Sequence, residues 1–302
     1  MKKVLVLSFS QSGQLTQIID NFLTPFTNVN IDWVKIEPKM PFPFPWSSKE
    51  FYSVMPETVL EEPITIHPPN FKYNEYDLIV LGYQPWYLSP SMTTTAIFEN
   101  KKFCTLINDK PIITIIGSRN MWLNAQESVK SFIKKAGGKL VANIPLADKT
   151  TNLISAITIL HWMSTGRKER KWGIFPLPGI SEKDINESHI FGEVIVKSLQ
   201  SNEYDNLQNK IIALNKITIN TSIMFIESRA KTLFRIWAKT IKKKGITQEK
   251  RTRWLIIFRR YLFFALFFVS PIVLTIYNIV FRPLTFGRIK RKKEYFRSVK
   301  LN

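Results

Sequence analysis

A short polar turn near the N-terminus has the chemistry to hold a phosphate group. It follows an apolar run and consists of Ser10, Gln11, Ser12, Gly13 and Gln14. The serine hydroxyls and the backbone N–H groups around the glycine can bind an anion where a helix begins. The turn contains no lysine, and neither the GxxxxGK[ST] nor the GxGxxG pattern, which argues against a P-loop and a dinucleotide site. The alternative is an ordinary helix N-cap.

A second candidate loop follows an apolar run that ends at Gly82, and it supplies aromatic rings. Its residues are Gln84, Pro85, Trp86 and Tyr87. The ring of Trp86 or Tyr87 can stack on a flat apolar ligand, while the loop backbone faces the polar edge of that ligand. The alternative role of these rings is packing at the rim of a sheet.

A third candidate loop carries a positive charge. It also follows an apolar run, and its residues are Gly117, Ser118, Arg119, Asn120 and Met121. Arg119 can stabilise negative charge on a bound redox ring, so we assign it both a cofactor-binding and a catalytic role. A surface salt bridge is the alternative.

The elements that would position these loops alternate between strand and helix patterns over the first 150 residues. Apolar runs predict strands at residues 3–9, 31–36, 77–81, 111–116 and 139–144. Apolar stripes between them predict helices, including one from Leu15 to Leu23 and one from Ala125 to Ala136. This alternation predicts a doubly wound parallel sheet, whose ligands bind beyond the carboxyl ends of the strands.

The three loops, taken in this order, resemble the FMN-binding loops of flavodoxins. The first is similar to their Ser/Thr-x-Ser/Thr-Gly phosphate loop, although the usual threonine is displaced by one residue to Thr16. The second is similar to their segment of Gly followed by Pro-x-Trp, with Trp86 directly after Pro85 here. The resemblance implies an α/β flavodoxin-like fold, a parallel five-stranded sheet in the order 2-1-3-4-5, and FMN as the cofactor.

A Pro-rich excursion interrupts the alternation. Residues 37–75 contain eight prolines, and the aromatic residues among them include Phe42, Phe44, Trp46, Phe51 and Tyr52. Such a segment cannot be one regular helix, and long loops in compact domains are often functional. It is either an apolar wall for a hydrophobic substrate or a surface cover whose rings pack on the sheet.

Few residues remain for other chemistry. Cys104 is the only cysteine and the chain has three histidines, which excludes an internal disulfide and argues against a metal centre. His161 ends an apolar stretch beside Trp162. It is either structural or a catalytic residue that exchanges protons with a substrate, because histidine titrates near neutrality.

The charge of the chain is concentrated in a C-terminal tail. The net charge is +20, and residues 231–302 hold 19 Lys or Arg against two acids, whereas residues 1–230 hold 24 against 21. Within the tail, residues 261–281 are 21 residues without a charge. As a helix this segment would be about 31 Å long, which matches a hydrocarbon core of about 30 Å. The combination favours a membrane as the partner and argues against nucleic acid.

The topology of this segment stays open. Eight bases lie in residues 242–260 and eight in residues 282–300, so a simple span would place one cluster on the outer side, against the positive-inside tendency. Ser270-Pro271 at the midpoint predicts a kink. A re-entrant hairpin with both flanks on anionic cytoplasmic lipid is the second option, and packing inside an oligomer is the third.

The pattern divides the chain into four parts. Residues 1–200 are the predicted FMN-binding domain and residues 201–260 a helical basic linker. Residues 261–281 are a membrane-spanning or re-entrant segment, and residues 282–302 a basic tail. The N-terminus does not have the pattern of a signal peptide, so we expect the domain on the cytoplasmic face of the inner membrane.

Several stretches resemble a bacterial flavodoxin-like family, the dialkylresorcinol condensing enzymes, which are the aromatases of flexirubin-type pigment pathways. The resembling stretches are residues 10–15, 41–47, 82–86 and 117–126. The resemblance implies oxidative aromatisation of a cyclic dione carboxylate to a 2,5-dialkylresorcinol, with loss of the carboxylate. It also implies a hydrophobic small-molecule substrate, and a ketosynthase of the same pathway as a candidate partner.

Two other functions stay open on the same fold. One is an NAD(P)H-dependent quinone or flavin reductase, and the other is a membrane-held electron carrier. The near-neutral charge of residues 1–230 weighs against a carrier, because flavodoxins that carry electrons are usually strongly acidic. The fold alone does not separate these functions.

Overall fold

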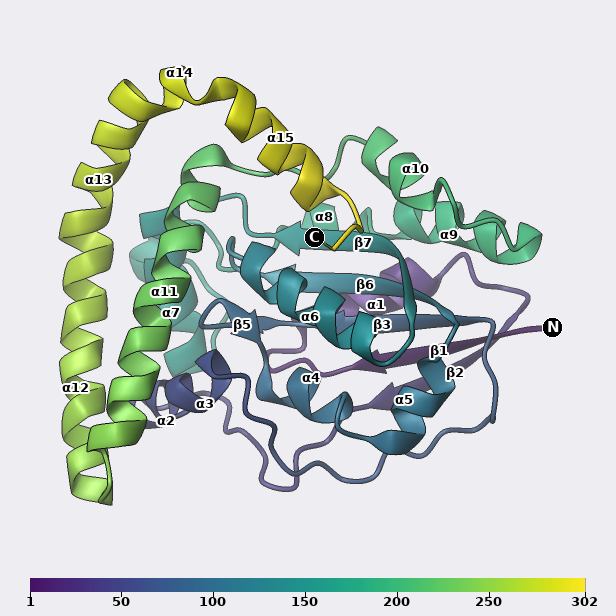
Figure 1. The fold of residues 1–302 in the computed structure, drawn as a ribbon, viewed down its shortest axis with the longest axis horizontal. Helices are drawn as coiled ribbons and strands as arrows, with labels where there is room; N and C mark the ends of the chain where they lie inside the picture. Colours follow the sequence, from purple (N-terminus) through teal and green to yellow (C-terminus); the bar gives the residue numbers. More distant parts are fainter. Residues whose placement is uncertain (302) are drawn as a thin grey trace.

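The computed structural model describes residues 1–301, and its centre is a five-stranded parallel sheet (Figure 1). The strands are β1 (Lys2–Ser8), β2 (Val29–Lys35), β3 (Leu78–Tyr83), β6 (Pro111–Ser118) and β7 (Lys139–Ala147). Their order is β2-β1-β3-β6-β7, and every neighbouring pair is parallel. The predicted flavodoxin-like order 2-1-3-4-5 is therefore confirmed.

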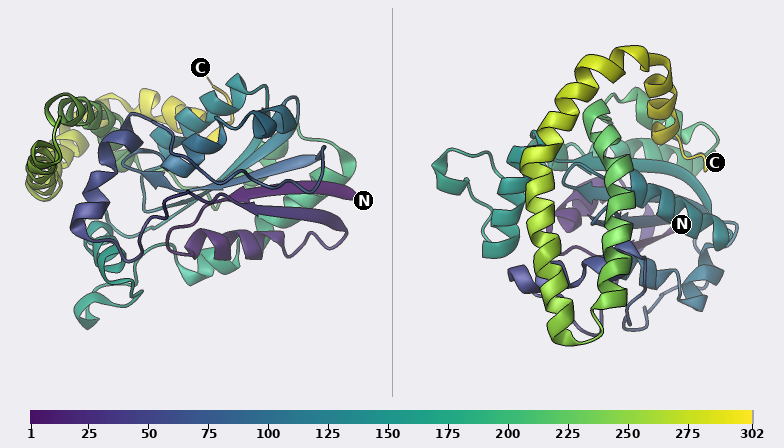
Figure 2. Two further views of the ribbon diagram at one scale, coloured as in Figure 1. Left: turned by 90° about the horizontal axis from the view of Figure 1, so that it is seen from below. Right: turned by 60° about the vertical axis from the view of Figure 1, so that its left-hand side comes forward.

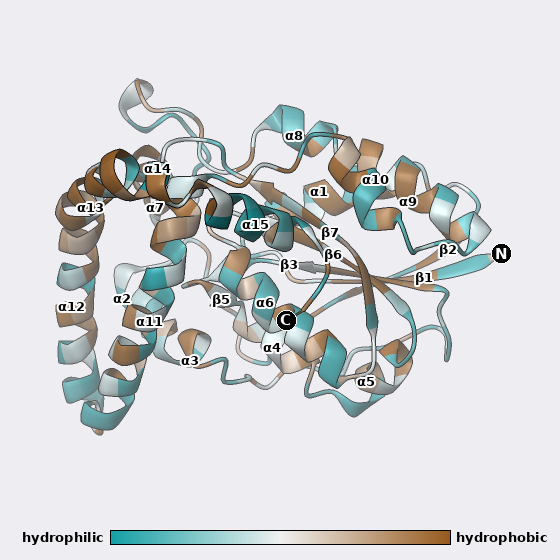
Figure 3. Ribbon diagram, turned by 45° about the horizontal axis from the view of Figure 1, so that its top comes forward, coloured by the Kyte–Doolittle hydropathy of each residue, from teal (hydrophilic) through white to brown (hydrophobic). Residues whose placement is uncertain are grey.

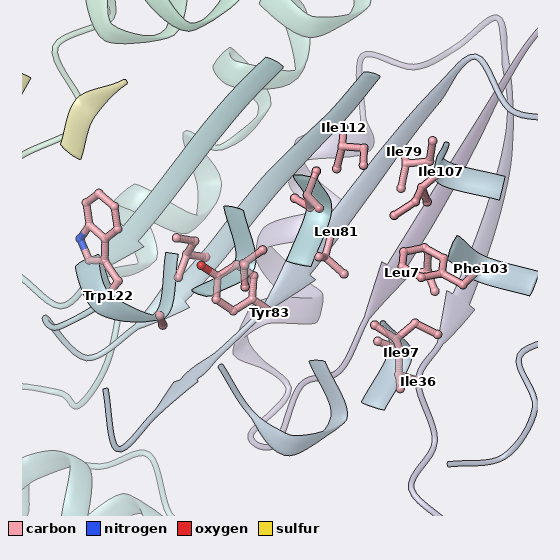
Figure 4. Packing of buried hydrophobic residues seen from close by; sticks show 14 of the residues in the cluster. Leu7, Ile36, Ile79, Leu81, Tyr83, Ile97, Phe103, Ile107, Ile112 and Trp122 are labelled. Carbon is pink, nitrogen blue, oxygen red and sulfur yellow. The ribbon is translucent and has the colours of Figure 1, made fainter. Parts of the chain in front are cut away.

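Helices cover both faces of the sheet, because successive strand residues point to opposite sides. One face carries α1 (Gln14–Leu23), α8 (Glu182–Asn186), α9 (His189–Ser201) and α10 (Leu207–Ala213). The other carries α4 (Met92–Ile97), α5 (Lys101–Ile107) and α6 (Leu123–Lys135). On this second face Leu7, Leu81, Phe103 and Ile112 belong to a cluster that is almost completely removed from water (Figure 4).

The core of the α/β unit continues past residue 200. Leu207 and Ile211 of α10 are fully buried, and Ile217 is nearly so. All three belong to the same cluster as the apolar side of α1. This part of the predicted linker therefore packs as part of the α/β unit.

The Pro-rich excursion folds into two short helices beside the carboxyl end of the sheet, α2 (Ser48–Ser53) and α3 (Met55–Val59) (Figure 1). A capping box starts α2. The backbone N–H of Glu50 donates to Ser47 Oγ at 3.2 Å, and the N–H of Ser47 donates to the Glu50 carboxylate at 2.9 Å. The segment is thus ordered by local capping and is not one regular helix, as its prolines predict.

Two long helices form an antiparallel hairpin across the carboxyl end of the sheet (Figures 1 and 2). They are α11 (Thr221–Lys244) and α12 (Gln248–Phe264). The second arm continues through a π-helical turn at Ala265–Val269, α13 (Ser270–Ile276), another π-helical turn at Tyr277–Phe281, and α14 (Arg282–Leu284). Pro271 has no N–H to donate, and a wider π-helical turn precedes it. Val269 and Ser270 keep helical backbone angles, so the helix is not interrupted at the predicted kink.

By length and composition, residues 248–284 form one helix that is able to cross a membrane. Its most apolar stretch of 18 residues has a mean hydropathy of 2.2, and 6% of that stretch is buried. Both ends of this helix contact the same α/β unit. Near its start, Arg251 Nη2 lies 2.7 Å from Glu57 Oε2. Beyond its end, α15 (Phe286–Arg297) returns to the unit, and the hydroxyl of Tyr295 donates to Glu127 at 2.5 Å. In this fold the two basic flanks therefore lie at opposite ends of one long helix, and both contact the same α/β unit (Figure 1).

Candidate functional site

A cavity lies at the carboxyl ends of β1, β3 and β6, where the three predicted loops meet. These loops contribute Gln11, Ser12, Gln14, Gln84, Pro85, Trp86, Tyr87, Gly117, Ser118 and Arg119 to its lining. The Pro-rich excursion adds Trp46 and Phe51, and α7 (Asn152–Thr165) adds one further wall. The remaining predicted residues Ser10, Gly13, Asn120 and Met121 belong to the same loops but not to the lining.

The first loop presents unpaired polar groups at the start of α1. Ser10 Oγ is buried and has no hydrogen-bond partner among the described residues. Gly13 is the N-cap of α1, with a φ of 80° that favours glycine, and no side chain caps the helix. Within residues 1–301 the backbone N–H groups of Ser12, Gly13 and Gln14 have no acceptor. The turn is therefore not an ordinary side-chain N-cap, and its free donors suit an anion.

Two glutamines hold this loop in place. The backbone N–H of Gln11 donates to Gln84 Oε1 at 2.9 Å, and the Gln11 side chain donates to the carbonyl of Pro43 at 2.8 Å. The side chain of Gln14 donates to the carbonyl of Ile180 at 3.0 Å and accepts from its N–H at 2.9 Å. The side-chain amides of Gln11, Gln14 and Gln84 thus position the loops and leave the backbone donors free for a ligand.

The second loop is a tight hairpin of β4 (Pro85–Trp86) and β5 (Ser89–Pro90). Its two turn residues, Tyr87 and Leu88, have φ values of 47° and 66°, the left-handed region that a two-residue turn requires. Residues other than glycine rarely adopt this backbone conformation, and such strain often accompanies functional sites. The hydroxyl of Tyr87 donates to the carbonyl of Phe51 at 2.7 Å, and burial raises the pKa of Tyr87 well above its ordinary value.

Aromatic rings from the Pro-rich excursion pack over the second loop, and we call Phe42, Trp46, Phe51 and Trp86 the aromatic roof. The ring of Trp86 packs edge to face with the rings of Phe42 and Trp46, and the ring centroids are 5.0 Å and 5.2 Å apart. Trp46 is 5% exposed, and its indole Nε1 has no acceptor among the described residues. The excursion therefore both covers the sheet edge and supplies an apolar wall, with one buried N–H left unpaired.

In the third loop Arg119 is held by backbone instead of by an acid. Its Nη1 donates to the carbonyl of Asn152 at 3.0 Å. Burial lowers the pKa of Arg119 to about 10, and the negative charges of Asp148 and Glu227 act in the opposite direction. No carboxylate within residues 1–301 forms a salt bridge with it, so the alternative role in a surface salt bridge is not what holds this side chain. Its buried positive charge is therefore available beside the cavity.

Two residues that shape this loop were not predicted. The side chain of Asn120 donates to Asn152 Oδ1 at 3.1 Å, and Glu227 of α11 accepts from the N–H of Asn124 at 2.8 Å, at the start of α6. Neither Asn152 nor Glu227 has a local sequence signal, because each acts across a large separation in the chain. A Cβ at Gly117 would lie 3.4 Å from the side chain of Leu15, an ordinary van der Waals contact, so packing does not require glycine at this position.

The structure does not bring His161 into the lining of the cavity. Its Nε2 lies 3.2 Å from Glu169 Oε1, whereas its neighbours Leu160 and Trp162 are part of the lining. A catalytic role for His161 therefore finds no support in this geometry.

The cavity is small for a cofactor and a substrate together. Its volume is about 220 Å³, below the range of roughly 300–1,000 Å³ of pockets for small organic ligands. A ring system alone would therefore extend through the mouth of the cavity or need the aromatic roof or α7 to move outward, and a second ligand would need further room.

No protein-family model matches this sequence, and no curated protein matches it. Similar solved structures include a flavoprotein in complex with FMN from Lactobacillus acidophilus NCFM. Its TM-score is 0.38 at 18% sequence identity, and the alignment covers 48% of this chain and 93% of that chain. A flavodoxin from the domain Archaea aligns with a TM-score of 0.36, 12% identity, 66% of this chain and 99% of that chain. A flavone reductase has a TM-score of 0.38, 9% identity, 68% of this chain and 65% of that chain. The fold assignment rests on the strand order of the sheet itself.

Proposed function

We propose that this chain is an FMN-dependent oxidoreductase that acts on a hydrophobic substrate at a membrane surface. The observation that carries the proposal is the meeting of three loops at one cavity, with free donors on one side and aromatic rings on the other. This division matches a ligand that has a phosphate at one end and a flat ring at the other.

The first loop fits the phosphate. Ser10 Oγ and the free N–H groups from Ser12 to Gln14 are neutral donors at the positive end of the α1 dipole. Without a ligand Ser10 Oγ stays buried and unpaired, which is costly. A phosphate at this point would remove that cost, which supports the proposal.

The second and third loops fit the ring. FMN, when bound, supplies two-electron redox chemistry. The rings of Trp86 and Trp46 offer apolar surface, and the unpaired indole N–H of Trp46 can donate to a polar atom of the ligand. Arg119 places positive charge at the third loop, which favours negative charge on a bound ring. These residues bind, orient and exclude water.

For the reaction itself we propose the oxidative aromatisation of a cyclic dione carboxylate to a 2,5-dialkylresorcinol. The support is the position of two of the four stretches that resemble the dialkylresorcinol condensing enzymes. Residues 41–47 build part of the aromatic roof, and residues 117–126 build the third loop and the start of α6. A substrate with two alkyl chains suits these apolar walls and the apolar helix that adjoins them. A ketosynthase that supplies this substrate remains a proposed partner.

The aromatic roof argues against the electron carrier. A one-electron carrier has to present the edge of its ring to a protein partner, whereas Trp46 over this cavity is 5% exposed. The NAD(P)H-dependent reductase remains the main rival, and a steady NAD(P)H oxidase rate in the absence of a dione would favour it.

The deciding experiment is the visible spectrum of the detergent-purified chain, followed by identification of the released cofactor. We expect the bands of an oxidised flavin and about one FMN released per chain. Anaerobic addition of a cyclic dione carboxylate should bleach the bands and release carbon dioxide. A colourless chain that takes up no added FMN would refute the cofactor assignment, and a flavin that is reduced only by NAD(P)H would refute the aromatase.

A further inference from the structure

The helix of residues 248–284 exposes one long apolar side. Its exposed apolar residues include Phe263, Phe264, Phe268, Val269, Ile272, Val273, Ile276, Ile279, Val280, Phe281 and Leu284. The opposite side packs on α11, where Tyr277 stacks on Phe225 at 3.7 Å. The helix therefore packs with one side on α11 and leaves these apolar side chains exposed. Its most hydrophobic stretch is the brown part at α13 and α14 in Figure 3.

A second exposed apolar feature lies in the loop of residues 166–179, which we call the basic loop. Trp172 is 75% exposed and Ile174 is 77% exposed. Four bases, Arg167, Lys168, Arg170 and Lys171, precede these two residues, with Glu169 as the one acid of the loop. Exposed Trp and Ile beside Lys and Arg is the composition of segments that bind at a membrane interface.

Both features lie at the same end of the molecule. The helical hairpin stands across the carboxyl end of the sheet (Figure 1), and the basic loop, in teal-green, projects from the same end in the left view of Figure 2. The N-terminus and the amino ends of the strands lie at the opposite end (Figure 1). One flat surface can therefore touch the apolar helix and the basic loop together.

The basic loop is continuous with the wall of the cavity. It follows α7, whose Ile159, Leu160 and Met163 line the cavity, and it ends at Gly179 and Ile180, which also line it. The hairpin adjoins the cavity on the other side. There the ring of Phe234 of α11 packs beside the ring of Tyr87, with the ring centroids 6.3 Å apart. The basic loop thus adjoins one side of the cavity, and α11, on which the apolar helix packs, adjoins the other.

We propose that the basic loop is a second membrane contact, which docks with the apolar helix on an anionic bilayer and turns the mouth of the cavity toward the lipid. Charge complementarity identifies the occupant. The residues that flank the apolar helix and those of the basic loop are strongly basic, and anionic lipid attracts such clusters. That a hydrophobic substrate then enters from the bilayer rests on the proposed function, whereas the docking itself does not.

The test places an environment-sensitive fluorophore at single positions of the full chain. In a Cys104→Ser background, one cysteine is introduced by Trp172→Cys, by Phe268→Cys or by Lys135→Cys, and each is labelled with a nitrobenzoxadiazole dye. Lys135, at the end of α6, is exposed at the opposite end of the molecule and serves as the control. Each sample is added to vesicles of phosphatidylglycerol and phosphatidylcholine, with and without a lipid nitroxide quencher, and its FMN content is measured.

We expect the labels at 172 and 268 to gain about twofold or more in emission and to be quenched by the nitroxide, as for groups at the headgroup boundary. The label at 135 should not change. A label at 172 that stays in water while the label at 268 is quenched would overturn the proposal and leave the helix as the only contact. If neither is quenched and the chain forms a dimer in solution, a second copy covers the helix and the membrane docking is refuted. Loss of FMN with intact quenching would refute the proposed cofactor alone.

Discussion

The carboxylate of Glu227, on α11, accepts a hydrogen bond at 2.8 Å from the backbone N–H of Asn124 in the first turn of α6. Glu227 is fully buried and its second oxygen, Oε2, has no partner among the described residues. The third loop of the cavity leads directly into α6. The helical hairpin is therefore coupled to the candidate site through one buried carboxyl group.

This contact predicts a pH-dependent stability. Burial raises the pKa of Glu227 from its ordinary 4.5 to about 7. The folded state then holds a proton that the unfolded state releases, so the free energy of unfolding falls as the pH rises from about 4.5 to about 7. We expect Glu227→Gln, which resembles the protonated acid, to exceed the parent in stability by about 1–3 kcal/mol at pH 8 and to match it near pH 4.5.

Urea unfolding between pH 4.5 and pH 8 measures this difference. Glu203→Gln, at an exposed site, is the matched control and should run parallel to the parent. Parallel curves for Glu227→Gln and the parent would show that the carboxyl group keeps its ordinary pKa.

Removal of the unpaired hydroxyl in the first loop should affect the ligand and spare the fold. Ser10→Ala removes an oxygen that has no protein partner, so the melting temperature of the cofactor-free chain should not fall. The affinity for FMN should drop about tenfold, as for the loss of one hydrogen bond to a charged group. Titration calorimetry measures it, and Ser10→Thr, which keeps the hydroxyl, should retain most of the affinity.

The charge of Arg119 should set the redox potential of a bound flavin. Arg119→Gln removes a buried positive charge, so the two-electron potential should become more negative by on the order of 30 mV. Arg119→Lys keeps the positive charge, so its redox potential should fall by less than that of the Gln variant. Dye-coupled anaerobic titration measures all three proteins, and an unchanged potential in the Gln variant would place the guanidinium too far from the ring to act.

The aromatic roof should depend on the indole N–H of Trp46. Trp46→Phe keeps an apolar ring over the cavity and removes an N–H that has no acceptor in the protein. The lost apolar surface of the indole and the removal of its unpaired N–H act in opposite directions on the stability of the cofactor-free chain, so its melting temperature should change little. FMN dissociation should accelerate roughly fivefold to tenfold. Stopped-flow release of FMN tests this, and an unchanged rate would mean that the N–H does not reach the ligand.

His161 should be dispensable for turnover. Its side chain contacts Glu169 and not the cavity, so His161→Gln should leave kcat within about twofold of the parent. A loss of a hundredfold or more with unchanged FMN content would instead restore it as a proton-transfer group.

The sheet was predictable because its strands are covered on both faces and read as continuous apolar runs, as in Val4 to Leu7. The three loops follow from the same reasoning, since the carboxyl ends of parallel strands share one edge. The hairpin at Tyr87 and Leu88 was not predictable, because two residues without glycine give no signal for a left-handed turn.

Contacts over long separations explain the rest. The cap on α6 comes from Glu227, about a hundred residues later in the chain, and nothing near either residue marks the pair. The position of His161 depends instead on the orientation of its helix. A helix turns by about 100° per residue, so its neighbours Leu160 and Trp162 line the cavity while His161 does not.

The helix of residues 248–284 is tied to the same α/β unit on both flanks, through Arg251 in its first turn and through Tyr295 of α15, beyond its end. No charged segment has to be carried through a hydrocarbon layer for this arrangement to form. The docking proposed above would therefore not require a translocation channel. Synthesis of the chain and its attachment to a membrane would then be separate events, which a cell could control independently.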